Sequence, residues 1–287
     1  MSAYLARDAT SRSEVKDAYD GPRSWALGKK RADDSTKSTG FGNIVHSLVC
    51  DPDEFPLRYI LEPSLDNRLT KAGKEAASPR STESYKDDVQ RLLSVHPNGQ
   101  IITLDDYEKA KACRDALKCH PEANRLLFTK RIEAEVTITF EYQGVKFKIR
   151  PDVVAEDHDG MLAVVDLKTC NDVSPQAFKR AVTKYGYDFS PWLYTRGCEQ
   201  EFGTPCTFYW PTIQTDGTQH VRVYRASPDM MRLSSQKFDQ GFANMMEYRA
   251  DPETSERAHD HQEIEDLGVD PWDNVNPEIT FGSASAD

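Results

Sequence analysis

The sequence predicts one medium-sized α/β domain with appendages. The chain has 287 residues, 38% of them hydrophobic, which is enough to bury a full core. Apolar residues recur with a helical period in the first part of the chain, and from Ile132 they recur with a period of two. Helical patterns return after Ser174. This order predicts a β-sheet segment that is preceded and followed by helical segments.

The first part of the chain contains three helix signals. Ser11 and Glu14 have the spacing of a capping box, which predicts a short helix. Residues 41–50 place their apolar side chains on one helical stripe, and a proline ends the pattern soon afterwards. Thr103 is placed as the N-cap of a further helix. Residues 29–40, charged and rich in small side chains, predict a mobile loop between two of these segments.

The alternating part predicts an antiparallel meander of three strands. The first strand covers 132–140, with Glu133 and Glu135 together on the face opposite its apolar residues. Turn residues lead from it to a second strand over 145–149 and then to a third over 161–168. Beyond the meander the sequence predicts helices from Ser174 and over 191–201, a hairpin of 207–213 with 220–225, and a last helix from Ser227 to about Arg249.

Two carboxylates and an amine fall at the ends of these strands. Asp166 and Lys168 are two positions apart in one strand, so both project from the same face. If the strand that ends at Arg150 is its neighbour, Asp152 reaches the same place. Two converging carboxylates repel each other unless a cation lies between them, and a hard divalent metal suits oxygen ligands. Each fragment alone also fits an exposed strand pair or a turn.

The charge of the chain is unevenly distributed. The net charge is −11, but residues 251–287 hold eleven of the 47 acidic residues and only Arg257 of the 36 basic ones. The remainder is close to neutral and can still hold a basic groove. The last segment has little periodicity, which predicts poor order. We therefore expect a folded domain over 1–250 and an acidic tail over 251–287.

Cysteine spacing and hydropathy indicate the compartment. The six cysteines show no C-x-x-C spacing, which favours free thiols in a reducing compartment over a zinc ribbon. No stretch approaches the roughly 20 apolar residues that span a bilayer, and no signal sequence is apparent. The sequence therefore predicts a cytoplasmic protein without membrane contact.

Pro151-Asp152, thirteen further residues and then Asp166-Leu167-Lys168 resemble the PD-(D/E)xK nuclease motif. Blocks in matching order resemble its RecE-like branch, the phage and prophage exodeoxyribonucleases that resect duplex DNA for recombination. These blocks are 41–46 with 51–55, 70–74, 120–121, 165–169, 174–178 and 185–187, within approximately residues 11–249. The resemblance implies a restriction-endonuclease-like core, in which a central mixed sheet is flanked by helices and preceded by a helical insert. It also implies a helical part over 11–128, a catalytic core over 129–250 and a bacterial host cell as the location.

The resemblance also implies roles for single residues. It implies that His46, Asp152 and Asp166 ligate Mg²⁺, or Mn²⁺ in its place, with the Leu167 carbonyl beside them. Lys168 is expected to orient or activate the attacking water.

An additional acid precedes the motif in the family. Glu135 matches this position, as a second-metal or water-bridged ligand with a catalytic role. Glu133, which is expected on the same face, is the alternative.

Contacts to DNA are less defined. Arg150 is expected near the scissile phosphate, and Lys179 and Lys184 are expected on phosphates, although a solvated helix face explains these lysines nearly as well. The branch carries a Gln four residues before a Tyr; here Tyr194 is present but Ser190 takes the Gln position. That departure puts the DNA contacts of this helix in doubt.

The implied function is a metal-dependent exonuclease acting 5′ to 3′ on linear double-stranded DNA, leaving 3′ overhangs for recombination. A structure-specific or restriction-like endonuclease and a catalytically silent DNA-binding scaffold are the alternatives. Expected partners are DNA ends, a single-strand annealing protein and further copies of the chain. Some related exonucleases hold an iron-sulfur cluster on four cysteines; Cys50, Cys170, Cys198 and Cys206 echo this pattern only loosely.

Overall fold

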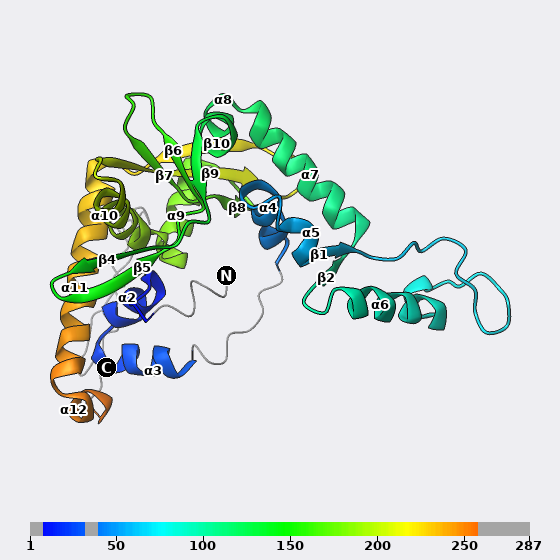
Figure 1. Ribbon diagram of the computed structural model, residues 1–287, viewed down its shortest axis with the longest axis horizontal. Helices are drawn as coiled ribbons and strands as arrows, with labels where there is room; N and C mark the ends of the chain where they lie inside the picture. The colour runs from blue at the N-terminus through cyan, green and yellow to red at the C-terminus, as the bar shows by residue number, and fades with distance from the viewer. Residues whose placement is uncertain (1–7, 32–39, 258–287) are drawn as a thin grey trace, which may run out of the picture.

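A mixed sheet lies at the centre of the computed structural model, which describes residues 8–31 and 40–257 (Figure 1). In spatial order its strands are β10 (Val221–Arg225), β9 (Cys206–Gln214), β7 (Leu162–Val165), β6 (Val153–Glu156) and β3 (Arg131–Ala134). A further short strand, β8 (Lys168–Cys170), also pairs with β9. β7 and β8 run parallel to β9, and the other neighbours are antiparallel. The predicted mixed α/β sheet is confirmed.

The inner strands of this sheet are buried on both faces. Val154 and Val164 belong to one core cluster, whereas Val153 and Val165 belong to another, because successive side chains of a strand point to opposite faces. The helices that contribute to the first cluster are α2 (Arg12–Tyr19), α3 (Pro22–Arg31), α9 (Pro175–Tyr185), the 3₁₀ helix η4 (Tyr187–Phe189), α10 (Ser190–Phe202) and α11 (Pro228–Ala250). The helices of the second are α4 (Phe41–Cys50), α5 (Phe55–Arg58), α7 (Leu104–Cys119), α8 (Pro121–Asn124) and the π-helix η3 (Arg125–Thr129).

Local sequence signals place most of these helices. α2 has the predicted capping box, in which Ser11 accepts from the Glu14 N–H and Glu14 accepts from the Ser11 N–H. Thr103 caps α7 as expected. The loop predicted over 29–40 is partly wrong, since residues up to Arg31 belong to α3; residues 32–39 lie outside the described residues, and Gly40 is the N-cap of α4.

The three-stranded meander is wrong. The alternating segment is divided between β3 and β4 (Ile138–Tyr142), and β4 pairs only with β5 (Val145–Ile149) in a separate hairpin. The chain turns at Glu135, which has a positive φ of 53°. The strand beside β7 is therefore β6 rather than the strand that ends before Arg150.

An arm projects from the body, as Figure 1 shows at the right. It contains the parallel pair β1 (Tyr59–Leu61) and β2 (Gln100–Ile102), with η2 (Pro79–Ser81) and α6 (Glu83–Val95) between them. The sequence did not predict this strand pair, because three-residue strands are too short to show a period.

The C-terminal region extends past the predicted last helix. α11 begins at the predicted Ser227 cap, and the short helix α12 (Pro252–Arg257) follows it and packs against α3 and α11. The remaining tail, 258–287, lies outside the described residues. Within the described part of the chain, no helix has both the length and the apolar character that a membrane crossing requires.

Candidate metal centre

The site forms where two neighbouring strands end. Asp152 directly precedes β6, and Asp166 directly follows β7. Val153 pairs with Val165 in the register of these two strands, so the two acidic residues lie at the same edge of the sheet. The Asp152 side chain is 13% exposed and the Asp166 side chain is 11% exposed. The two carboxyl groups are therefore both largely removed from solvent.

Lys168 reaches Asp166 along the same face. β7 and β8 keep one register on β9, with Val165 opposite Tyr209 and Lys168 opposite Thr212. The predicted strand is interrupted at residues 166–167, yet the alternation persists through the interruption. Lys168 Nζ donates to Asp166 Oδ1 at 2.6 Å, which places the amine and the carboxylate side by side as expected.

Helix α4 brings His46 to the two acids. Gly42 lies one turn before His46, and a Cβ at this position would lie 2.6 Å from the Thr169 Oγ1 atom. The glycine therefore lets α4 approach β8 closely. His46 Nε2 lies 2.8 Å from Asp152 Oδ1 and 3.4 Å from Glu135 Oε1.

Glu135 enters the site because the chain turns there. Its left-handed backbone, uncommon for a residue with a side chain, directs the chain from one sheet to the hairpin, and its N–H donates to the Asp152 carbonyl. Arg150 Nε donates to Glu135 Oε2 at 2.5 Å. Glu133, the alternative acid, lies within β3, where it pairs with Val154, and it is exposed, whereas Glu135 is the acid that faces His46.

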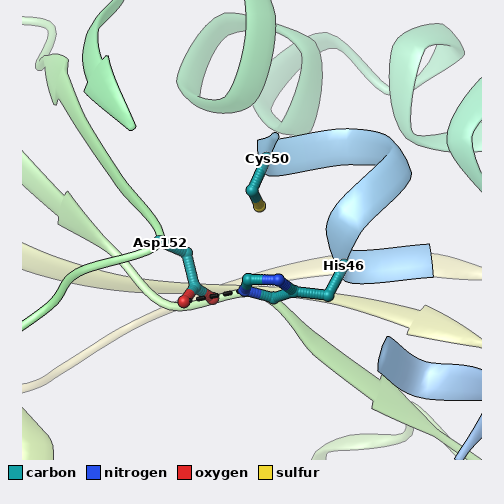
Figure 2. A group of neighbouring side chains, drawn as sticks. All are labelled: His46, Cys50 and Asp152. Carbon is teal, nitrogen blue, oxygen red and sulfur yellow. Dashed lines mark ion pairs between the residues drawn. The ribbon is translucent and has the colours of Figure 1, made fainter. Parts of the chain in front are cut away.

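Cys50 is the residue that sequence reasoning missed as part of the site. Its sulfur, an imidazole nitrogen of His46 and a carboxylate oxygen of Asp152 lie within 4.8 Å of one another. Figure 2 shows the sulfur above the ion pair of His46 and Asp152. The signal was the spacing of four residues between His46 and Cys50, which puts them on one side of a helix.

The buried charges shift the pKa values of the first pair. Burial opposes the protonated form of His46, but the charge of the Asp152 carboxylate, the Cys50 sulfur and the hydrogen bonds to both groups together more than offset this, so the pKa of His46 lies well above its usual value. Burial likewise opposes the ionised form of Asp152, yet His46 and the Leu167 N–H, which donates to Asp152 Oδ2 at 2.7 Å, lower the pKa of this acid. A raised pKa for His46 and a lowered pKa for Asp152 are the shifts expected when the two residues form an ion pair.

The pKa values of the two remaining acids, Asp166 and Glu135, are raised. Burial raises the pKa of Asp166 against the attraction of Lys168, and the nearby charge of Asp152 raises it further. Burial also raises the pKa of Glu135, while His46 lowers it. Burial is the main cause for both acids, and the charge of Asp152 adds to it; a bound divalent cation would favour the ionised form of both groups.

Lys168 has a second neighbour that the sequence did not identify. Its ammonium lies 4.8 Å from the ring centre of Tyr187, in η4 (Tyr187–Phe189). Burial would lower the pKa of Lys168, but the carboxylates of Asp166 and Asp152 raise it. The amine is therefore held protonated in a fixed place.

The other residues expected to contact DNA lie apart. Lys179 and Lys184 are exposed on α9, consistent with either reading of these lysines. Tyr194 is partly buried and packs against the core residue Phe208, and Ser190 is buried at the start of α10.

The four cysteines that loosely echo an iron-sulfur site do not come together. Cys50 belongs to the core cluster on one face of the sheet, whereas Cys170, Cys198 and Cys206 pack with the cluster on the other face.

The donor atoms fit a divalent metal. Imidazole nitrogen suits transition metals, and carboxylates suit Mg²⁺ and Mn²⁺. Among the residues that the structure describes, His46, Cys50 and Asp152 are the one group of three or more such side chains that is close enough to hold an ion. Asp166 lies beside this group, and its Oδ1 atom accepts a hydrogen bond from Lys168.

Comparison with known proteins agrees with the fold. A crystal structure from Eubacterium rectale, named "Putative exonuclease", is similar with a TM-score of 0.52 and 13% identity, over 85% of this chain and 82% of that chain. A structure named SSO0001 has 13% identity over 69% of this chain and 84% of that chain, but its TM-score of 0.27 is too low to indicate a shared fold. No curated protein matches the chain.

A family match covers most of the sequence. Residues 22–264 match the family described as "PDDEXK-like domain of unknown function (DUF3799)". This range contains both acidic strand ends and the helix that carries His46. The PD-(D/E)xK assignment made from the motif therefore agrees with an independent comparison, and the chain belongs to this family of PDDEXK-like domains.

Proposed function

We propose that this protein is a divalent-metal-dependent nuclease that hydrolyses phosphodiester bonds in double-stranded DNA. The observation that carries the proposal is the convergence of His46, Glu135 and Asp152 beside the bonded pair of Asp166 and Lys168. These groups come from distant parts of the chain and are held in a partly buried place. An arrangement of acids around a histidine and a fixed amine suits phosphoryl transfer.

Mg²⁺, with Mn²⁺ as a substitute, is the ion proposed for the site. His46, Asp152 and Asp166 would hold it, with the Leu167 carbonyl beside them and Glu135 as an additional or water-bridged ligand. When bound, the ion would neutralise charge on the phosphate and lower the pKa of a water.

The chain's own groups supply the orientation. Asp152 is fixed by the Leu167 N–H at one oxygen and by His46 at the other, so its carboxylate has little rotational freedom. Lys168 carries a compact positive charge held 2.6 Å from Asp166, where it would orient the attacking water or stabilise charge that develops on a phosphate oxygen. Arg150 positions Glu135 through a 2.5 Å hydrogen bond.

The finer assignment rests on the RecE-like sequence blocks. They favour an exonuclease that starts at a linear end, proceeds 5′ to 3′ and leaves 3′ overhangs for recombination. DNA ends, a single-strand annealing protein and further copies of the chain are the partners proposed on that basis. An endonuclease acting through the same groups is the alternative outcome of the test.

Digestion of three labelled substrates tests the activity. The full-length protein is incubated with 5′-labelled linear, 3′-labelled linear and covalently closed circular duplex, with Mg²⁺ or with a chelator. We expect release of short products from linear DNA with Mg²⁺ and an intact circle. Cleavage of the circle would favour the endonuclease, and cleavage in the presence of the chelator would contradict metal dependence.

Single-site variants test the residues. Asp166→Ala is expected to abolish cleavage, and normal turnover would exclude this site. Lys168→Ala is expected to lower the rate while DNA binding is largely retained, since one amine among many cations contributes little affinity. Glu135→Gln is expected to impair cleavage, and Glu133→Gln is its matched control because that acid is exposed in the neighbouring strand. Equal effects of the two would remove Glu135 from the proposed site.

A further inference from the structure

A thiol lies within the proposed metal centre, and the nuclease chemistry does not use it. Cys50 is fully buried at the C-terminal end of α4, and its sulfur points toward the pair of His46 and Asp152 (Figure 2). The three ligand atoms lie within 4.8 Å of one another. A single cation placed among them can contact all three after small side-chain adjustments.

A purely structural role does not explain this placement. Cys113, on α7, is an equally buried cysteine of the same core cluster. Among the described residues, however, the group of potential ligands around a metal position includes Cys50 and not Cys113. The thiol at position 50 therefore has polar neighbours that an ordinary core cysteine lacks.

We infer that Cys50, His46 and Asp152 form a binding site for a thiophilic divalent cation such as Zn²⁺, with the Cys50 sulfur as a direct ligand. The inference rests on the proposed function only in sharing its metal centre. Mg²⁺ prefers oxygen ligands and gains little from sulfur, whereas Zn²⁺ and Co²⁺ bind thiolate, imidazole and carboxylate together. A sulfur ligand from Cys50 would therefore raise the affinity of the site for Zn²⁺ or Co²⁺ but not for Mg²⁺, the ion proposed for catalysis.

Binding requires a simple exchange of a proton for the metal. The Cys50 S–H bond breaks, the proton passes to solvent, and a sulfur–metal bond forms without any change in oxidation state. His46 contributes a ring nitrogen and Asp152 a carboxylate oxygen, the ligand atoms that the grouping with Cys50 offers. The His46 side chain is 31% exposed, so this ligand of the group is accessible from solvent.

Cobalt spectroscopy tests the sulfur directly. Metal-free full-length protein is titrated with Co²⁺, and the near-ultraviolet charge-transfer band that a cysteine–cobalt bond produces is recorded. Zn²⁺ is then added to displace Co²⁺, which yields the relative affinity for Zn²⁺. The same titrations are made with Cys50→Ser, Cys50→Ala and the matched control Cys113→Ser, after thermal unfolding has established that each variant is folded.

We expect the band in the wild type and in Cys113→Ser, its loss in both variants of Cys50, and a loss of Zn²⁺ affinity of about tenfold or more in those variants. A bound Co²⁺ without the band, no binding of Co²⁺, or a band that persists without Cys50 would each overturn the inference. If one Cys50 variant does not fold, the other gives the result. Absence of Mg²⁺-dependent DNA cleavage would refute the nuclease and would leave this band unaffected, so the two proposals fail separately.

Discussion

Replacing Asp152 by Asn tests whether the ion pair stabilises the metal-free protein. Asp152 Oδ1 lies 2.8 Å from His46 Nε2, and Oδ2 accepts a 2.7 Å hydrogen bond from the Leu167 N–H. The amide oxygen of Asn can still accept from Leu167, but the charge facing His46 is lost. A hydrogen bond between charged groups contributes about 1.5–3 kcal/mol. Since the His46 ring is 31% exposed and water can partly replace the carboxylate, we expect a loss of about 2 kcal/mol in the free energy of unfolding.

An opposing effect is expected to be smaller. The substitution removes the repulsion between Asp152 and Asp166, which by itself would stabilise the protein. Asp166, however, is already compensated by Lys168 at 2.6 Å. We therefore expect the lost contact with His46 to dominate.

The pKa shifts of His46 and Asp152 determine the pH range in which this loss of stability is expected. The pKa of His46 is raised above 6.5, so its contribution is fully present below pH 6.5 and is lost as the pH rises through the pKa of the folded state. The pKa of Asp152 is lowered from 3.8, so its contribution is present above pH 3.8 and is lost as the pH falls through the lowered value. The difference between wild type and Asp152→Asn should therefore be largest between pH 3.8 and 6.5 and should shrink in alkaline buffer.

Denaturant unfolding with a chelator present measures this difference. Wild type and variant are compared at one pH inside that window and at one alkaline pH. Glu133→Gln is the matched control, because an exposed acid of the neighbouring strand is expected to change stability by no more than about 0.5 kcal/mol. An unfolding midpoint for Asp152→Asn equal to wild type at both pH values would refute the ion pair.

Three further predictions concern the scaffold and the tail. Gly241→Ala should lower the free energy of unfolding by about 1–3 kcal/mol, measured by denaturant, because its Cβ would lie 2.6 Å from the Val15 carbonyl oxygen and backbone cannot rotate away. Lys237→Met should cost about 3–5 kcal/mol in the same assay, because it leaves the Asp188 carboxylate, 1% exposed and bonded to Lys237 at 2.7 Å, without its cation. A chain ending at Arg257 should keep its thermal unfolding midpoint and should bind linear duplex more tightly at low salt, with little difference at high salt, since an acidic tail repels DNA over a screened distance.

Matched controls separate these effects from general damage. Gln240→Ala changes the exposed neighbour of Gly241 and is expected to cost no more than about 0.5 kcal/mol. Arg232→Met removes an exposed cation from the same helix, whose partner Asp229 is exposed as well, and is expected to cost no more than about 1 kcal/mol. Losses in these controls equal to those of the test variants would contradict the close helix contact and the buried pair. A lower unfolding midpoint for the truncated chain would place the tail within the fold.

Several local elements follow from the sequence because short-range chemistry determines them. The capping box at Ser11, the Thr103 cap and the Ser227 cap each satisfy N–H groups at a helix start, and the structure has a helix at each. The period of two likewise places Asp166 beside Lys168, because that relation survives the interruption between β7 and β8.

The sequence could not show which strands lie side by side in the sheet. The apolar residues after Ile132 keep alternating through the turn at Glu135. One continuous strand and a chain that passes from β3 in one sheet to β4 in another therefore have the same sequence pattern. The positive φ at Glu135 is a backbone property that carries no marker such as glycine. The choice of Glu135 over Glu133 as the acid beside His46 was therefore made only by the tertiary structure.

The sequence by itself determined the chemical types at this site: two acids and a lysine at strand ends and, through the family resemblance, a histidine on the helix of residues 41–50. Their periodicity is local and needs no partner. The tertiary structure decided which groups meet, because α4 packs on the sheet through its apolar residues and through the close approach of Gly42 to Thr169, residues 127 positions apart in the numbering. That approach places Cys50 beside His46 and Asp152, and such long-range packing leaves no periodic trace in the chain.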